Sequence, residues 1–397
     1  MSIPAVPFLD LVTPHREMEE ELVAAFREAL RSAAFIGGAQ VDAFEREFAE
    51  FCGSTHCVGV ARLDTRCHQR EAHRVCAVGD AVVTVAHTFI ATCEAISQAG
   101  AGVEFVDIDA RTYCMNPAEL ETYLAACEVD SRTGRPLGQR TGKPIAAVLP
   151  VHLYGQVADM DAILATASRY GLFVVEDACQ AHGAEYRTGS GTWKRAGTFG
   201  KAAAFSFYPG KNLGACGEAG AVTTDDEHVA RTIRMLREHG QAQKYYHDLE
   251  GYNGRLDANQ AAFLRVNLRR LSEWTSQRRA AAARYGELLS STAGVTLPYE
   301  SDRSRSVYHL YVIRHHERDV LAEYLKSQGV STGLHYPLPV HLQKCYAAWG
   351  YTEGHLPATE RAANEILSLP MFPGLSSAQQ RRVGESITTF DNRLVER

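Results

Sequence analysis

The feature that most constrains the fold is an alternation of apolar runs and amphipathic segments that starts near residue 80. The apolar runs predict strands, and the amphipathic segments, several of which end on glycine, predict helices. The predicted strands cover residues 81–85, 103–109, 146–155 and 172–178, and the predicted helices cover residues 89–100, 116–127 and 159–171. This order predicts a mostly parallel sheet with helices on both faces. Ligands of such sheets bind beyond the carboxyl ends of the strands, so chemistry is expected after Val85, Val151 and Val175.

A further helix is predicted after residue 224. Thr224 and Glu227 have the spacing of a capping box, and Gly240 follows the last apolar position. The apolar residues of one face are Val229, Ile233 and Leu236.

The rest of the chain predicts a second, smaller unit. Residues 259–289 form one long helical pattern that could bridge two domains, and residues 295–397 carry the short strands and helices of an α+β domain. A chain of 397 residues that is 45% hydrophobic has enough apolar material for this division. We therefore predict an N-terminal arm and large α/β domain over 1–255, and a bridging helix with a small domain over 256–397.

Composition excludes several classes of protein. The net charge of −6 provides no general attraction for nucleic acid. No run of about 18 apolar residues occurs, so no membrane-spanning helix is predicted. The first residues show no basic stretch followed by an apolar run, and the ten cysteines form no CxxC pair. We therefore expect a cytoplasmic protein with reduced cysteines.

A lone lysine lies in a turn after a strand-like segment, within GKAAAFSFYPGKNLGACGEAGAVTT (200–224). Lys211 follows Pro209 and Gly210 and has apolar neighbours. A lysine amine that is partly removed from water loses some preference for its charged form and becomes a nucleophile for carbonyls, as in Schiff-base formation. The alternative interpretation is a surface lysine in a flexible loop.

Two other residues extend this hypothesis. Asp177 closes an apolar strand in VVEDACQAHGA (174–184), where it either caps a turn or keeps a pyridinium nitrogen protonated so that the ring accepts electrons. Phe89 opens a helix directly after a strand in HTFIATCEAI (87–96). It is either part of the core or lies flat on a cofactor ring.

Taken together, these segments resemble the DegT/DnrJ-type sugar aminotransferases, a pyridoxal-phosphate family of fold type I. The resemblance runs from PFLDL (7–11) to HYPLPVHLQKCY (335–346). Its motifs HTFIAT, PVHLYGQ, EDACQAHGAEY, FSFYPGKNLGACGEAGAV and YNGRLD occur in the family's order and spacing. The resemblance implies an α/β fold with a mostly parallel sheet flanked by helices and a smaller C-terminal α+β domain. It also implies pyridoxal 5'-phosphate as the cofactor.

The resemblance assigns roles to individual residues. It implies that Lys211 holds the cofactor covalently and moves the proton in transamination, that Asp177 pairs with the ring nitrogen, and that Gln180 lies beside the phenolic oxygen of the ring. Three further cofactor contacts are implied, namely Phe89 stacked on the ring, Ser206 at the phosphate, and Asn253 reaching a phosphate from a neighbouring subunit. A contact of the last kind implies a homodimer with shared active sites.

Four more residues fall in motifs that resemble the substrate-side loops of the family. They are His152, Tyr154, His335 and Tyr336. A histidine in a His-Tyr-Pro segment is, taken alone, more often structural, and this alternative stays open for His335.

The segment ARLDTRCHQREAHRVCAVGD (61–80) departs from the family. Relatives carry here a Ser-Gly-Thr-Asp-Ala turn that opens an apolar helix, and glycine, threonine and the helix N-terminus bind the phosphate. The matching positions read Arg62, Leu63, Asp64, Thr65 and Arg66. A carboxylate ~4 Å from a phosphate is repulsive by about 1 kcal/mol even in water. We therefore predict a weakened phosphate site in which Thr65, one position late, is the remaining candidate contact.

The lost apolar pattern has sharp edges and preserves the chain length, which favours two compensating frame slips in the gene. A genuinely divergent, solvated helix is the main alternative. A metal site lacks the paired ligand spacing, although Cys67, His68, His73 and Cys76 lie here, and a nucleic-acid patch lacks aromatic residues. We expect neither a metal nor a nucleic-acid partner.

The function implied by the resemblance is transfer of an amino group from L-glutamate to a keto nucleotide-sugar. The motifs look closest to those of members acting on dTDP-3-keto-6-deoxyhexoses, in amino-sugar or polysaccharide biosynthesis. The alternative is a catalytically impaired or non-catalytic homologue with a binding or regulatory role, which the disrupted turn at 61–66 favours. A dehydratase is disfavoured because those relatives carry a histidine where Lys211 stands.

Overall fold

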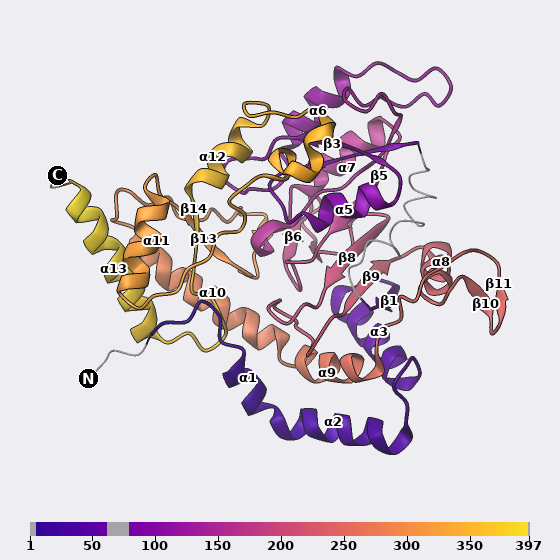
Figure 1. The fold of residues 1–397 in the computed structure, drawn as a ribbon, viewed down its shortest axis with the longest axis horizontal. Helices are drawn as coiled ribbons and strands as arrows, with labels where there is room; N and C mark the ends of the chain where they lie inside the picture. Colours follow the sequence, from indigo (N-terminus) through magenta and orange to yellow (C-terminus); the bar gives the residue numbers. More distant parts are fainter. Residues whose placement is uncertain (1–4, 62–78, 396–397) are drawn as a thin grey trace.

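The computed structural model describes residues 5–61 and 79–395, and within these ranges seven strands form one sheet (Figure 1). The strand order is β1-β9-β8-β5-β4-β2-β3. The strands are β1 (His56–Val60), β2 (Ala81–Val85), β3 (Gly102–Val106), β4 (Ile145–Val148), β5 (Phe173–Asp177), β8 (Ala202–Ser206) and β9 (Gly220–Thr224). The neighbours from β3 to β8 pair in parallel, whereas β9 is antiparallel to both β8 and β1. The prediction of a mostly parallel sheet is confirmed.

The alternation of strands and helices follows the predicted order. The helices between the parallel strands are α5 (Ala91–Gln98), α6 (Pro117–Ala125) and α7 (Met160–Arg169). The side chain of Asn116 caps α6 by accepting the N–H of Ala118 at 3.0 Å, next to the predicted Pro117 at the first turn. The predicted strand at 146–155 is shorter, because the chain leaves the sheet after Val148 and turns through the 3-10 helix η1 (Leu153–Gly155).

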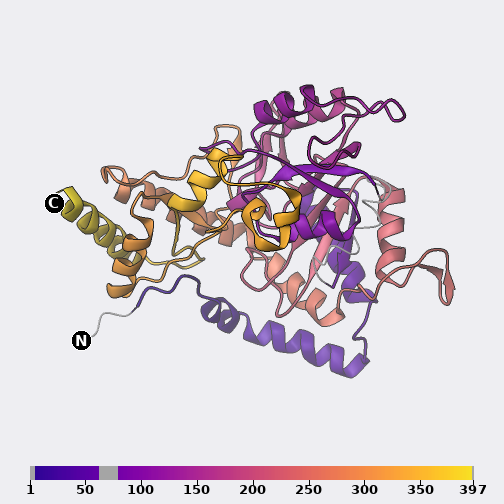
Figure 2. The ribbon, with the colours of Figure 1, turned by 45° about the horizontal axis from the view of Figure 1, so that its top comes forward.

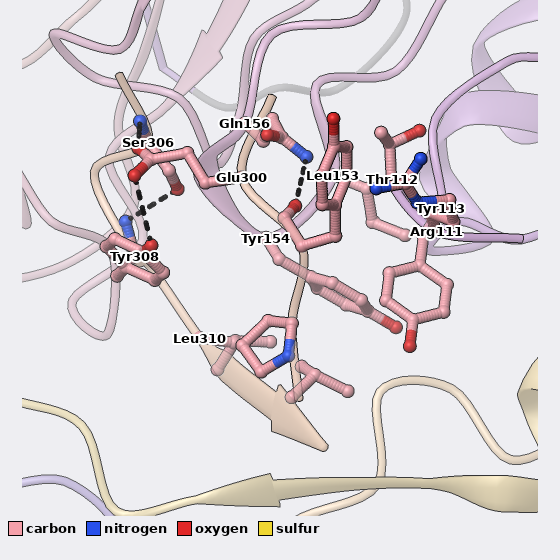
Figure 3. Close-up of a pocket in the computed structure, with 13 residues that line it drawn as sticks. Arg111, Thr112, Tyr113, Leu153, Tyr154, Gln156, Glu300, Ser306, Tyr308 and Leu310 are labelled. Atoms are coloured by element: carbon pink, nitrogen blue, oxygen red, sulfur yellow. Dashed lines mark hydrogen bonds between the residues drawn. The ribbon is translucent and has the colours of Figure 1, made fainter. Parts of the chain in front are cut away.

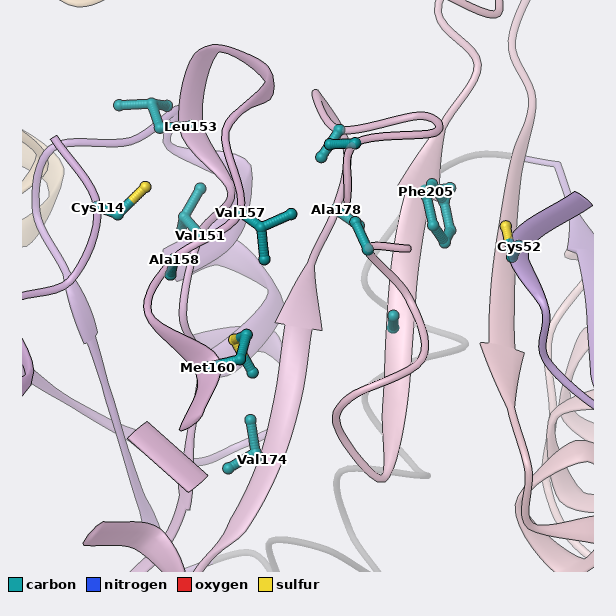
Figure 4. Close-up of a cluster of buried hydrophobic side chains, with 14 of the residues drawn as sticks. Cys52, Cys114, Val151, Leu153, Val157, Ala158, Met160, Val174, Ala178 and Phe205 are labelled. Carbon is teal, nitrogen blue, oxygen red and sulfur yellow. The ribbon is translucent and has the colours of Figure 1, made fainter. Parts of the chain in front are cut away.

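Aromatic side chains join helix α3 (Ala39–Cys52) to one end of the sheet. Phe44 and Phe48 of α3 meet Phe207 edge-on at centroid distances of 5.3 and 5.2 Å, and Phe48 meets Phe205 at 5.0 Å. Each of these rings is completely buried, and such burial contributes about 1.5–3 kcal/mol per side chain. The same cluster continues under β4 and β5, where Val157, Met160 and Val174 lie (Figure 4). Because Phe205 and Phe207 flank Ser206, the last residue of β8, these contacts pack α3 against the carboxyl end of that strand.

Helix α8 (Glu227–Arg237) begins differently from the prediction. Its N-cap is Asp226, whose Oδ1 accepts the N–H groups of His228 at 2.8 Å and Val229 at 3.2 Å. Thr224 is still the last residue of β9, and its hydroxyl donates to the carbonyl of Lys201. The predicted capping box is therefore wrong, because the sheet uses the threonine. The predicted buried face of Val229, Ile233 and Leu236 is confirmed.

The long helical pattern at 259–289 is two helices, α9 (Ala258–Leu268) and α10 (Leu271–Leu289). Arg269 and Arg270, which lie at the break, keep right-handed helical dihedral angles. Because neither residue is proline or glycine, the sequence pattern gives no sign that the helix is interrupted there. Helix α9 packs in the core beneath the sheet, and α10 packs in a second cluster with Tyr285 and Leu289. The two helices lie in different cores, and the role of this segment as a bridge between domains stays a prediction.

The second cluster contains β13 (Tyr311–Arg314), which pairs antiparallel with β14 (Ile366–Leu369), and helices α11 (Arg318–Ser327) and α13 (Ser377–Val395). Val6 of the N-terminal arm joins it and donates its N–H to the carbonyl of Gly329 at 2.8 Å. Figures 1 and 2 both show α2 (Glu19–Ser32) beside α9, below the sheet. The domain boundary between residues 255 and 256 stays a prediction.

Shorter elements complete the described chain. They are α1 (Val12–Glu17), β6 (Glu185–Arg187), β7 (Trp193–Arg195), β10 (Gln241–Gln243), β11 (Tyr246–His247), β12 (Ser304–Arg305), η2 (Val340–Leu342), η3 (Lys344–Trp349) and α12 (Pro357–Glu365). In the part of the chain that the structure covers, no helix is long and apolar enough to cross a bilayer.

Candidate active site

The candidate site lies where β5 and β8 end side by side. Asp177 is the last residue of β5 and Ser206 is the last residue of β8, and the parallel register sets Asp177 opposite Ala204. Lys211 follows β8 after one turn, in which its N–H donates to the carbonyl of Tyr208 at 2.8 Å. The sheet topology therefore brings the predicted lysine and carboxylate to one edge.

The carboxylate of Asp177 is held by two donors. Oδ2 accepts the hydroxyl of Thr92 at 2.7 Å, and Oδ1 accepts the N–H of Cys179 at 3.2 Å. The Cys179 bond is the turn interaction that the structural interpretation of Asp177 anticipates. The Thr92 bond is not part of that turn. It comes from helix α5 and fixes the orientation of the carboxylate. A fixed carboxylate at a sheet edge stabilises a nearby cation.

Lys211 is partly buried, in contrast to the surface lysine of the alternative interpretation. Burial lowers the pKa of its amine, while the neighbouring Cys179 and Asp177 raise it in part. A lowered pKa increases the fraction of neutral amine near pH 7, and the neutral amine is the form that attacks a carbonyl.

Gln180 is bonded on both ends of its amide. Oε1 accepts the N–H of Tyr154 at 2.7 Å, and Nε2 donates to the hydroxyl of Tyr336 at 3.3 Å. The hydroxyl of Tyr154 donates to the carbonyl of His335 and lies 2.9 Å from Nε2 of His87. Tyr154 and Tyr336 therefore both hydrogen-bond to Gln180. The hydroxyl of Tyr154, however, already bonds to groups of the protein.

Phe89 is not a core residue. Its side chain is 53% exposed, although the preceding residue and the strand before it are buried. Its ring lies 5.5 Å from that of Tyr336, at an interplanar angle of 39°. A large exposed ring at this edge provides the flat apolar face that a cofactor ring needs.

The two predicted histidines differ in their surroundings. His152 is fully buried, its Nε2 donates to Glu176 at 2.9 Å, and its Nδ1 accepts the N–H of Ala158 at 3.2 Å. No ring nitrogen of His152 remains for a substrate, so we remove it from the candidate substrate contacts. His335 is partly buried and stacks on Phe8 at 5.5 Å, and its Nδ1 lies 2.9 Å from Oγ of Ser368.

The candidate phosphate contacts are less tightly bonded. Oγ of Ser206 accepts the N–H of Tyr208 at 3.3 Å, and Asn253 is exposed in a segment that pairs with Glu238. Thr65 and its neighbours lie outside the described residues, as does the Cys/His segment at 67–76. Among the residues that are described, no group of three or more His, Cys, Asp and Glu side chains could hold a metal ion.

Sequence reasoning missed three polar residues near the lysine. Thr92 holds Asp177, and its place one turn after Phe89 in the HTFIAT motif could have indicated this. His182 is fully buried beside Phe205, and burial, followed by the charge of Lys211, lowers its pKa to about 3. His309 directs Nδ1 to Oδ1 of Asn212 at 3.2 Å. No local pattern pointed to the last two, because their contacts are set by the tertiary fold.

These residues fit a pyridoxal-type cofactor. A partly desolvated amine, a fixed carboxylate, an exposed aromatic face and an amide with an N–H to spare lie at one sheet edge. They match, in turn, the carbonyl, the cationic ring nitrogen, the ring face and the phenolic oxygen of such a group.

Fold and site together define a pyridoxal-phosphate enzyme of fold type I. The family model described as the DegT/DnrJ/EryC1/StrS aminotransferase family matches residues 16–388, so the chain belongs to this family. The predicted family, fold and cofactor are confirmed.

Similar proteins cover the whole length of the chain. It is 43% identical over 387 residues to the pleiotropic regulatory protein of Geobacillus stearothermophilus, covering 97% of this chain and 98% of that protein. It is 40% identical over 394 residues to dTDP-3-amino-3,4,6-trideoxy-alpha-D-glucose transaminase of Streptomyces venezuelae, covering 98% and 97%. The crystal structure of S. venezuelae DesV, with a ketimine intermediate, has a TM-score of 0.89 at 40% identity and covers 98% of this chain and 100% of that one.

Proposed function

We propose that this protein transfers an amino group from L-glutamate to the keto group of a nucleotide-linked sugar. The observation that carries the proposal is the partly buried amine of Lys211 beside the fixed carboxylate of Asp177. The S. venezuelae relative supports the substrate class, since its name describes a dTDP-sugar transaminase. A dTDP-linked 3-keto-6-deoxyhexose is the proposed acceptor, and the product would serve amino-sugar or polysaccharide biosynthesis.

Pyridoxal phosphate supplies an electrophilic carbonyl and an electron-accepting ring when bound. Lys211 would hold this group covalently through Nζ. As a free amine, Nζ would take up the proton that leaves the donor carbon in the first half of the reaction and give a proton to the acceptor carbon in the second half. The lowered pKa of Lys211 suits this exchange, because an amine with a pKa nearer neutrality both accepts and gives up a proton readily.

The neighbouring side chains bind and orient. Asp177 keeps the ring nitrogen cationic, Phe89 covers one face of the ring, and Gln180 donates an N–H to the phenolic oxygen. Ser206 would contact the phosphate, and Asn253 would reach the phosphate of a neighbouring subunit. Thr65, the other proposed phosphate contact, lies outside the described residues. The exposure of Asn253 in the single chain is consistent with this last role.

The substrate side consists of His335 and Tyr336. Burial, followed by the charge of Lys211, lowers the pKa of His335 to about 4, so its ring is neutral at pH 7 and bonds to substrate without adding charge. We propose a cytoplasmic homodimer, because a contact from Asn253 would complete each site only in a pair of chains.

A second candidate is a catalytically impaired homologue with a binding or regulatory role. The observation that favours it is the replacement of the phosphate turn at residues 62–66. The regulatory name of the Geobacillus relative is compatible with it. The lowered pKa of Lys211 and the bonded side chains of Asp177 and Gln180 favour the enzyme.

The test is incubation of the protein with pyridoxal phosphate, L-glutamate and a panel of keto nucleotide-sugars, with detection of 2-oxoglutarate and of the aminated sugar. The proposal expects 2-oxoglutarate in proportion to aminated product for at least one dTDP-linked 3-keto sugar. Binding of cofactor without either product would support the regulatory alternative. Formation of 2-oxoglutarate must disappear in Lys211→Ala, which serves as the blank.

A further inference from the structure

Tyr154 has an unusual backbone conformation. Its φ is 60° and its ψ is 1°, in the left-handed region, although it is not a glycine. This conformation is unfavourable for an L-residue, so the surroundings must hold it in place. Figure 3 shows the residue between the loop of Tyr113 and the segment of Tyr308 and Leu310.

The side chain of Tyr154 is anchored at its far end. The ring is 7% exposed, and its hydroxyl donates to the carbonyl of His335. A hydroxyl has one proton to give, so Nε2 of His87, at 2.9 Å, must be the donor of the second bond. Burial lowers the pKa of His87 to about 4, which leaves a neutral ring with its proton on Nε2. The hydroxyl therefore has no capacity left for a substrate, in contrast to its predicted role.

The backbone of Tyr154 acts on Gln180. The left-handed turn presents the N–H of Tyr154 to Oε1 of Gln180 at 2.7 Å. Since an amide has one carbonyl and one NH₂ end, this bond decides which end points to the site. Nε2 of Gln180 is turned toward Tyr336, where it donates one N–H to the hydroxyl at 3.3 Å. Its second N–H has no partner among the residues that the structure describes.

We propose that Tyr154 is a positioning residue for Gln180, whose amide it orients so that an N–H faces the phenolic oxygen of the bound cofactor. The hydroxyl of Tyr154, bonded to the carbonyl of His335, holds the backbone of Tyr154 in its left-handed conformation. The N–H of that backbone in turn holds the amide of Gln180. This inference rests on the proposed function, because it assigns Gln180 to the cofactor. It also explains why one short turn contacts His87 before helix α5 and His335 in the C-terminal region.

The test compares Tyr154→Phe with Tyr113→Phe. Tyr113 is a matched control, because it is 4% exposed, has a φ of 61°, and lies 5.6 Å from the ring of Tyr154. Its hydroxyl has no hydrogen-bond partner among the described residues, so its loss removes one hydroxyl of the same kind without touching Gln180. The readouts are the affinity for pyridoxal phosphate and the ratio of the two absorbance bands of the bound cofactor, which reports protonation of the phenolic oxygen.

We expect Tyr154→Phe to bind the cofactor about three- to tenfold more weakly and to change the band ratio, as the loss of one well-placed hydrogen bond would. Tyr113→Phe should stay within about twofold of the parent protein. Equal behaviour of the two folded variants would overturn the inference. If the parent protein bound no cofactor, the proposed function itself would fail. If the parent bound cofactor and the two variants behaved alike, only the role of Tyr154 would fail, so the two failures are distinguishable.

A second pair of variants covers the case in which Tyr154→Phe does not fold. His87→Leu removes the donor to the Tyr154 hydroxyl, and His87→Gln restores an N–H near the position of Nε2. We expect His87→Leu to change the band ratio in the same direction as Tyr154→Phe and His87→Gln to return it toward the parent value. Identical ratios in both His87 variants would contradict the proposal.

Discussion

The ring end and the phosphate end of the candidate site are built very differently. At the ring end, Asp177 and Gln180 each make two hydrogen bonds that fix their orientation, and burial lowers the pKa of the Lys211 amine. At the phosphate end, Ser206 makes one long bond, Asn253 is exposed, and the family's glycine-threonine turn is replaced. From this difference we propose that catalysis and cofactor affinity are set by separate groups of residues, so that weaker binding of the phosphate would leave the chemistry at the ring intact.

The largest effect is expected at the ring end. Lys211→Ala removes the only group proposed to move the proton, and the rate should fall by about a thousandfold. The measurement is the single-turnover reaction with L-glutamate, followed by cofactor absorbance. Lys194→Ala, at an exposed lysine of β7, is the control and should keep the parent rate. If Lys211→Ala reacted at the parent rate, Lys211 would not move the proton, and the ring end would not carry the chemistry assigned to it.

Acid should destabilise the protein through the histidines of the ring end. Burial lowers the pKa of His87 to about 4, whereas the unfolded chain takes up this proton near pH 6.5. Stability is therefore complete above about pH 6.5 and is lost as the pH falls toward 4, by on the order of 3 kcal/mol for His87 alone.

Denaturant unfolding at pH 7, 6 and 5 measures this loss. His87→Gln should reduce the pH dependence by the share of His87, because His182 and His335 still contribute. His228→Gln, at an exposed histidine of α8, should leave it unchanged. A parent protein whose stability did not fall between pH 7 and 5 would show that the ring end lacks buried neutral histidines.

Asp177→Asn tests the electrostatic part of the ring end. Loss of a charge-assisted bond to a cationic ring nitrogen costs about 1.5–3 kcal/mol, which corresponds to about a 10- to 100-fold lower rate. The rate of the glutamate half-reaction at saturating cofactor is the readout, and Asp302→Asn, at an exposed aspartate, is the control. An unchanged rate in Asp177→Asn would mean that the fixed carboxylate does not act on the ring.

The phosphate end should give the smallest effect, and on a different quantity. Leu63→Gly combined with Asp64→Thr removes one repulsive carboxylate and adds a donor, which should raise cofactor affinity about tenfold. The single-turnover rate at saturating cofactor should stay the same. An unchanged affinity would indicate that residues 62–66 do not contact the phosphate.

Local patterns predicted the elements well where one segment decides its own structure. The alternation from β2 to β5 and the buried face of α8 followed from hydrophobic periodicity. The N-cap of α8 was predicted at the wrong residue because Thr224 and Asp226 are both suitable N-caps. Thr224 belongs to β9 and bonds to Lys201, which leaves Asp226 to cap the helix. The break between α9 and α10 was not predicted because it falls at Arg269 and Arg270, and arginine is a good helix former.

The site shows the same division. Asp177 and Gln180 lie in one motif and Lys211 in another, and the pairing of β5 with β8 brings Asp177 near Lys211. His152 and Tyr154 lie in one motif as well, yet their partners Glu176 and His335 come from other strands and from the C-terminal region. Such contacts depend on the packing of distant segments, which a linear pattern does not encode.

The most direct measurement is reduction of the cofactor-loaded protein with borohydride, followed by mass spectrometry of its peptides. The account predicts that the yellow colour bleaches and that a single reduced pyridoxal phosphate adduct maps to the lysine of YPGKN, Lys211. A protein that carries no adduct there, or carries it on another lysine, would contradict the central claim.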